Sequence, residues 1–186
     1  YAFFAYITHF ITRKPFIVCQ TGLYIQNYSK RNKLFRKIVI HILNKALFVN
    51  VPGEKSKFFW EKLKINRDKI NILHSTINTE YFTPSSKQYI YDFVFTGRLI
   101  PLKNIDKILI AFSKLTIKSK NLKIAIVGSG ILLEKLKELV IQLNIANNVK
   151  FLGFQKDVKI ILDKSRFFIM ASKSEGLPCS LMEAMS

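Results

Sequence analysis

Short apolar runs alternate along the chain with segments in which apolar residues recur at helical spacing. The short runs predict buried strands at residues 16–19, 46–51, 70–73, 91–96, 122–127, 149–152 and 166–171. The periodic segments predict helices at residues 1–12, 34–47, 54–64, 131–143 and 157–163, and from Ile105 and about Pro178 onward. Because strands and helices alternate with short connections, the pattern predicts an α/β fold with a doubly wound parallel sheet in each half.

A turn-rich segment separates the two halves. Thr83-Pro84-Ser85-Ser86 combines proline with small polar residues, which is typical of the connection between domains. We therefore expect one domain over residues 1–84 and a second over residues 85–186.

The charge of the chain is strongly positive and is spread over both halves. Residues 1–83 hold 14 basic and 4 acidic residues, and residues 84–186 hold 16 and 8, which gives +10 and +8 of the total +18. Such a field attracts polyanions, either nucleic acid or an anionic membrane. Lysine dominates over arginine, and no Cys/His finger or RNP-like motif is present, so we expect no nucleic acid as partner.

Two further features of the sequence bear on the location of the protein. Cys19 and Cys179 are too few for a disulfide framework, which fits a reducing cytoplasm. No run of about 18 apolar residues is present, so any membrane contact is expected to be peripheral. The basic, amphipathic segment 34–47 either lies on an anionic membrane surface or packs on the sheet with its lysines in water.

Candidate chemistry lies in the loops that follow the strands of the second half. After the strand 91–96, Gly97 allows close backbone approach, and Arg98 and Lys103 bring two cations to an edge where a diphosphate can be neutralised, with Asn104 beside them at a helix start. The next strand ends in Gly128-Ser129-Gly130, a tight turn without the full dinucleotide fingerprint, which disfavours a nicotinamide cofactor.

The last loop and helix of the chain carry two carboxylates, eight residues apart. Glu175 precedes Gly176 and Pro178 in the loop, and Glu183 lies within the helix that follows. Two glutamates near a helix start are in themselves typical of a solvated face with favourable dipole contacts.

The segment EGLPCSLMEAM at residues 175–185, read together with the two loops upstream, resembles the signature of the retaining family-4 (group 1) glycosyltransferases. This resemblance implies the GT-B architecture of two Rossmann-like domains, with a nucleotide-diphosphate sugar donor bound by the second. It also implies transfer of a sugar with retention of configuration, to a glycan or lipid-linked acceptor at the cytoplasmic membrane face.

The same resemblance implies a role for each motif residue. Arg98 and Lys103 would neutralise the donor diphosphate, with Gly97, Asn104, Gly128 and Gly130 forming the loops around it. Glu183 would accept the ribose hydroxyls, and Glu175 would be the catalytic residue that holds the sugar with the amides of Gly176 and Leu177. No metal or other cofactor is expected. Thr21 stands where the family often has a histidine, which departs from the family pattern.

The resemblance further suggests that both domains are incomplete, so the chain is expected to be a fragment or a truncated gene product. Two other functions stay open on the sequence. The chain could be an inactive nucleotide-binding module associated with membranes, or a phosphoribosyl- or nucleotide-handling enzyme of similar topology, although the latter leaves the Glu175 to Glu183 segment unexplained.

Overall fold

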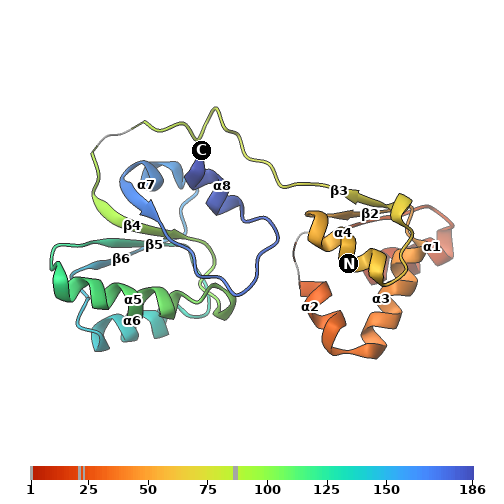
Figure 1. Cartoon of the computed structure of the whole chain (residues 1–186), viewed down its shortest axis with the longest axis horizontal. Helices are drawn as coiled ribbons and strands as arrows, with labels where there is room; N and C mark the ends of the chain where they lie inside the picture. Colours follow the sequence, from red (N-terminus) through yellow and green to blue (C-terminus); the bar gives the residue numbers. More distant parts are fainter. Residues whose placement is uncertain (1, 21, 23, 86–87) are drawn as a thin grey trace. The chain divides into compact units, whose positions relative to one another are not determined.

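The computed structural model describes residues 2–20, 22, 24–85 and 88–186. These residues divide into two compact units, each with its own sheet and apolar core (Figure 1). The first unit holds the residues up to Thr76 together with Glu175–Leu177, and the second holds Ile77–Ser174 and Pro178–Ser186. The predicted domain boundary between residues 84 and 85 lies within the second unit and stays a prediction.

The first unit is built on a parallel sheet whose strands follow the order β1 (Ile17–Cys19), β2 (Phe48–Val51) and β3 (Ile70–Ile72). Its helices are α1 (Ala2–Thr12), α2 (Tyr24–Arg31), α3 (Lys33–Lys45) and α4 (Glu54–Lys62), followed by a 3-10 turn η1 (Arg67–Lys69). Aliphatic side chains from these elements pack around the buried indole of Trp60 and include Val18, Leu43, Val49, Val51 and Ile70.

Helix α2 is not predicted by the apolar pattern, because its sequence YIQNYSKR is polar and basic. Asn32 separates α2 from α3. The side-chain oxygen of Asn32 accepts a hydrogen bond from the backbone N–H of Phe35 at 2.9 Å, which caps α3 and fixes its start at Lys33. The two helices therefore form a sharp corner between the strands β1 and β2.

The second unit holds a parallel sheet in the order β6-β5-β4-β7. Its strands are β4 (Tyr91–Thr96), β5 (Ile124–Val127), β6 (Val149–Gly153) and β7 (Ser165–Phe168). Its helices are α5 (Ile105–Lys118), α6 (Leu133–Gln142), α7 (Lys159–Asp163) and α8 (Cys179–Met185), with a 3-10 turn η2 (Pro101–Lys103). The prediction of parallel sheets is thus confirmed in both units.

Helices cover both faces of this second sheet (Figure 1). Residues of α5 and α6 pack on one face around Phe95, Ile124 and Ile126, and residues of α7 pack on the other around Val94, Ala125 and Val127. Each strand of the buried centre contributes to both cores, which explains why β4 and β5 read as continuous apolar runs.

Strand β7 ends earlier than its apolar run, which extends to residue 171. Among the described residues only β4 pairs with β7, and the last backbone bond of this ladder runs from the N–H of Ile169 to the carbonyl of Val94 at 2.9 Å. The chain then leaves the sheet edge, so Met170 and Ala171 belong to the loop that leads to α8 rather than to the strand.

Candidate active site

The order of the strands creates a switch point at the C-terminal edge of the second sheet. From β4 the chain moves outward through β5 to β6, and it then returns to place β7 on the opposite side of β4. The loops that follow β4 and β7 lie at this point, and open α/β sheets bind ligands outside the carboxyl ends of the strands at such a switch point. The loops that carry the predicted site residues of this unit lie at this edge.

Two glycines allow the loops after β4 and β5 to pack with their backbones in contact. A Cβ atom added to Gly128 would stand 1.9 Å from the carbonyl oxygen of Gly97, and one added to Gly130 would stand 2.4 Å from the carbonyl oxygen of Leu99. Backbone bonds join the same loops, from Leu99 N–H to the Ser129 carbonyl at 2.8 Å and from Leu132 N–H to the Leu99 carbonyl at 3.0 Å. Gly128 and Gly130 therefore determine the shape of the loop that carries Arg98.

Lys103 lies over Gly97, whereas Arg98 faces solvent. A Cβ atom placed on Gly97 would stand 3.8 Å from the Cε atom of Lys103, so the lysine stem crosses the glycine. The side chain of Arg98 is exposed and that of Lys103 is half-buried. The structure thus brings both cations to the loop between β4 and α5, as the sequence predicts.

Asn104 ties this loop to the loop that follows β7. Its backbone adopts the left-handed conformation, with φ 49° and ψ 40°, which asparagine tolerates better than most residues. Its Nδ2 donates to the carbonyl of Ala171 at 2.9 Å, and the N–H of Lys173 donates to the carbonyl of Leu102 at 2.9 Å. Asn104 thus fixes the relative positions of two ligand-side loops, and its contact with a donor stays a prediction.

The two glutamates occupy different environments. Glu175, Gly176 and Leu177 group with the first unit, and their contacts with the donor sugar stay a prediction. Glu183 lies in α8 of the second unit, as predicted. Thr21, the other residue singled out in the first half, lies outside the described residues.

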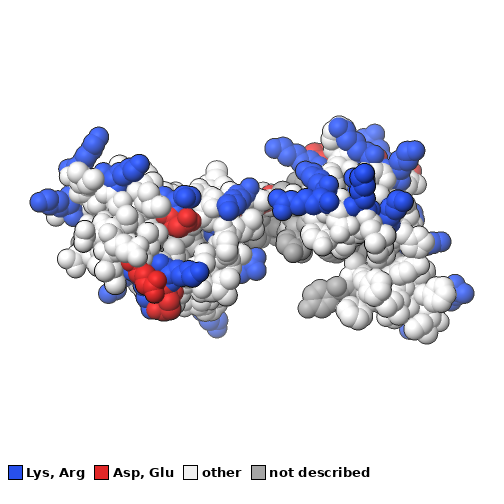
Figure 2. Space-filling model, turned by 90° about the horizontal axis from the view of Figure 1, so that it is seen from below, with Lys and Arg blue, Asp and Glu red and all other residues white. Residues whose placement is uncertain are grey.

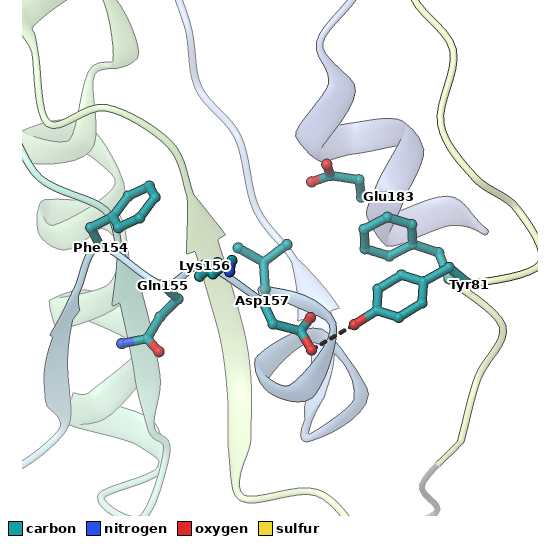
Figure 3. A pocket seen from close by; sticks show the side chains of 8 residues that line it. Tyr81, Phe154, Gln155, Lys156, Asp157 and Glu183 are labelled. Carbon is teal, nitrogen blue, oxygen red and sulfur yellow. Dashed lines mark hydrogen bonds between the residues drawn. The ribbon is translucent and has the colours of Figure 1, made fainter.

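Glu183 borders a pocket of about 590 Å³ that the sequence did not indicate (Figure 3). The loop after β6 and the start of α7 contribute Phe154, Gln155, Lys156, Asp157 and Val158, and the segment before β4 contributes Tyr81 and Phe82. Phe154 is 76% exposed. Because the N–H of Gly128 donates to the carbonyl of Gly153 at 2.7 Å, the end of β6, directly before Phe154, adjoins the glycine turn after β5.

Burial perturbs the carboxyl group of Glu183. Removal from water disfavours its charged form and raises the pKa of Glu183 above the usual glutamate value. Across the pocket, the Tyr81 hydroxyl donates to Asp157 Oδ2 at 2.6 Å. This hydrogen bond to a carboxylate, with partial burial and the charges of Asp157 and Asp163, raises the pKa of Tyr81. A half-buried carboxyl group and aromatic rings on one pocket wall suit a ligand with hydroxyl groups and a flat ring.

A second set of contacts holds the segment before β4 against α7. Ser85 and Lys159 both donate to Asp163 Oδ2, the latter over 2.5 Å, and Lys159 Nζ also lies 3.0 Å from Ser85 Oγ. Burial alone would raise the pKa of Asp163, but the hydrogen bonds from Lys159 and Ser85 and the lysine charge outweigh it and lower the pKa. The wall that carries Tyr81 is therefore anchored at two points.

The pocket residues differ in how far the sequence could have indicated them. Phe154 and Gln155 follow a predicted strand at the same edge as the two recognised loops, so strand order alone could have suggested them. Tyr81 carried no such signal, because its contact with Asp157 spans 76 residues of sequence.

Within the ranges that the structure describes, no group of three or more His, Cys, Asp or Glu side chains is placed to hold a metal ion. In these same ranges, no helix is both long and apolar enough to cross a bilayer.

Known proteins resemble this chain in both sequence and structure. The family described as glycosyl transferases group 1 matches residues 82–186. An uncharacterized glycosyltransferase of Methanocaldococcus jannaschii is 38% identical over 109 residues, which is 55% of this chain and 27% of the relative. The N-acetylgalactosamine-N,N'-diacetylbacillosaminyl-diphospho-undecaprenol 4-alpha-N-acetylgalactosaminyltransferase of Campylobacter jejuni is 27% identical over 181 residues, or 94% of this chain and 49% of the relative.

The structure of Anabaena HepE in complex with UDP-glucose superimposes with a TM-score of 0.84. The match covers 99% of this chain and 54% of that chain, with 17% sequence identity. At that identity the likeness concerns the fold alone. The chain spans half or less of the length of the two curated relatives.

Proposed function

Because the chain belongs to the glycosyl transferases group 1 family, we propose that it works as part of an enzyme that moves a sugar from a nucleotide-diphosphate donor to an acceptor. The observation that carries this proposal is the C-terminal edge of the second sheet, where a basic loop follows β4 and a pocket bordered by Glu183 lies at the loop after β6, with the glycine turn after β5 between them. The fold class agrees with the family, since both sheets are parallel and Rossmann-like, as the GT-B architecture requires.

In the proposed complex, Arg98 and Lys103 bind the donor diphosphate. Two cations held at the edge of a parallel sheet neutralise the charge that develops on the leaving group, so the reaction needs no metal ion. The packing of Gly97 against Gly128 supports this role, because it fixes the loop before the ligand arrives and avoids the cost of ordering it.

The pocket beside Glu183 receives the nucleoside. Glu183 accepts hydrogen bonds from the ribose hydroxyls, and the exposed ring of Phe154 offers a face on which the base can stack. The UDP-glucose named with the HepE structure supports a nucleoside diphosphate as the class of donor.

The sugar itself is assigned to the loop between β7 and α8. Glu175 is proposed as the catalytic residue that holds the sugar hydroxyls, with the amides of Gly176 and Leu177, and transfer is proposed to proceed with retention. The sequence likeness to the group 1 transferases supports this assignment.

The acceptor is proposed to be a lipid-linked glycan or a surface polysaccharide at the cytoplasmic membrane face. The name of the Campylobacter jejuni relative, which acts on a diphospho-undecaprenol substrate, supports this class of acceptor. The net charge of +18 supports work near an anionic surface.

The proposal is tested by donor binding to the full-length protein and to the variants Arg98→Ala and Lys103→Ala, measured by calorimetry with UDP. Each variant should lose about tenfold or more in affinity, since each removes a charge-assisted hydrogen bond. Lys107→Ala is the matched control, because Lys107 lies nearby on α5, is exposed and pairs with Asp106 at 3.7 Å. Equal affinities of all four proteins would contradict the proposed role, and UDP binding without sugar transfer would favour the inactive nucleotide-binding module.

A further inference from the structure

The loops that follow β4 and β7 run side by side at the C-terminal edge of the second sheet. Two hydrogen bonds of 2.9 Å join them, one from Nδ2 of Asn104 to the carbonyl of Ala171 and one from the N–H of Lys173 to the carbonyl of Leu102. Lys103 lies between these bonds in the chain. The backbone of Lys173 is therefore fixed beside the loop that carries Lys103, at the switch point of the sheet.

Lys173 adds a further cation to this edge. Its residue is exposed, as is Arg98, whereas the preceding Ser172 is half-buried. Within the described residues the ammonium group of Lys173 takes part in no ion pair, because the pairs found there join other side chains. The charge of Lys173 is thus available to a ligand, on a loop whose backbone is already held in place.

Position rather than exposure distinguishes Lys173 from other lysines of the chain. On the face that Figure 2 shows, Lys and Arg side chains are scattered over both units, and Asp and Glu side chains are few. An exposed lysine is therefore no sign of a site by itself. Lys173 belongs instead to the loop that leads from β7 to α8, and α8 carries Glu183 at the border of the pocket.

The proposed donor leaves the charge of Lys173 without a counterpart. Each phosphate of a nucleotide-diphosphate sugar carries a negative charge, and in the proposed function Arg98 and Lys103 balance these charges. The nucleoside is neutral. A third cation at the same edge therefore has the capacity to bind another anion.

We propose that Lys173 binds a second anionic group of the substrates, distinct from the donor diphosphate. Two sources share this chemistry, the carboxylate of a uronic acid in the donor and the phosphate of a lipid-linked acceptor. The ammonium group donates charge-assisted hydrogen bonds to either, so Lys173 determines specificity for a charged substrate over a neutral one. The inference rests on the proposed function, because it takes the donor diphosphate to be held by Arg98 and Lys103.

Calorimetry with the full-length protein tests the donor as the source. If the donor supplies the anion, the parent should bind UDP-glucuronic acid about tenfold more tightly than UDP-glucose, since a carboxylate replaces a hydroxymethyl group. Lys173→Gln should lose this preference and keep its affinity for UDP, and Lys173→Arg should retain most of the preference. The matched control is Lys118→Gln, an exposed position at the far end of α5, about 20 Å along that helix from the edge.

Binding of undecaprenyl phosphate in non-ionic detergent micelles, with UDP at saturation, tests the acceptor as the source. If the acceptor supplies the anion, Lys173→Gln should weaken this binding about tenfold and leave the binding of undecaprenol, which lacks the phosphate, unchanged. The variant Lys118→Gln measures how far the general attraction of a basic protein to an anionic micelle contributes.

A selective loss in either experiment supports the proposal and identifies the source of the anion. No loss in both experiments, an equal loss in Lys118→Gln, or an equal weakening of UDP itself would overturn it. A parent protein that does not bind UDP would contradict the proposed function, whereas a parent that binds UDP while Lys173→Gln changes neither preference contradicts this inference alone.

Discussion

Glycine at residue 128 is required by the approach of two backbones rather than by a ligand. Its φ of 133° lies in a region that other residues rarely adopt, and the site of its missing Cβ lies 1.9 Å from the Gly97 carbonyl oxygen. A side chain here must push the Arg98 loop away from the sheet edge.

The variant Gly128→Ala should therefore destabilise the protein by about 2 kcal/mol or more and weaken UDP binding, as measured by urea denaturation and calorimetry. Gly53→Ala serves as control, since Gly53 has an extended φ of 172° and open space around its Cα. If both variants unfold at the same urea concentration, the close packing of these loops has no energetic consequence.

Glu183 is expected to act on stability and on ligand binding in opposite directions, because its pKa is raised in the folded protein. Between the usual glutamate pKa and the raised value, the folded state binds more protons than the unfolded state, so stability falls as the pH rises through this window. At neutral pH the charged form of Glu183 therefore lowers the free energy of unfolding.

Replacing Glu183 by Gln should remove that cost, so the variant should be at least as stable as the parent at pH 7, with the difference shrinking as the pH falls. Binding of UDP should weaken about tenfold, because the ribose hydroxyls lose a charged acceptor. Denaturation at several pH values and calorimetry give the two quantities. A variant that is less stable at neutral pH would show that Glu183 supports the fold instead.

Among the elements, the segment that precedes β4 depends on helix α7 for its position. The contact of Ser85 and Lys159 with Asp163, and that of Tyr81 with Asp157, are the links that hold one pocket wall. The side chains of Lys159 and Asp163 are each 15% exposed, so solvent screens their interaction less than that of a surface pair.

Asp163→Asn should accordingly cost about 1 kcal/mol at pH 7. Because the folded pKa is lowered, the stabilisation is present above the usual aspartate value and is lost as the pH falls through the folded pKa. Glu134→Gln breaks the exposed pair with Lys137 at 2.9 Å and should change stability by less than about 0.5 kcal/mol. Urea denaturation at pH 7 and below pH 4 measures the stability of both variants. A loss of stability in Asp163→Asn that is greatest in acid would refute the prediction.

The elements were predictable to different degrees. Strand β4 has the limits that its apolar run indicates, because it is buried on both faces and ends at a glycine. Helix α2 was missed because it has little apolar periodicity. Strand β7 ends early because, in the part of the chain that the structure describes, it pairs with β4 alone. The apolar pattern of the sequence indicates which residues are buried, whereas the hydrogen bonds to a neighbouring strand decide where a strand at the edge of a sheet ends.

For the whole molecule, the sequence by itself determined two parallel sheets, the family, the helix that carries Glu183, and the loops that carry Gly97, Arg98, Lys103, Asn104, Gly128 and Gly130. These follow from periodicity and from residue types at strand ends, which are local properties of the chain. Tertiary structure alone decided that Gly128 meets Gly97, that Asn104 bonds to Ala171, and that Tyr81 closes a pocket with Asp157 and Glu183. The physical reason is that such contacts join residues tens of positions apart, whose approach depends on strand order and on the packing of loops rather than on any neighbouring residue.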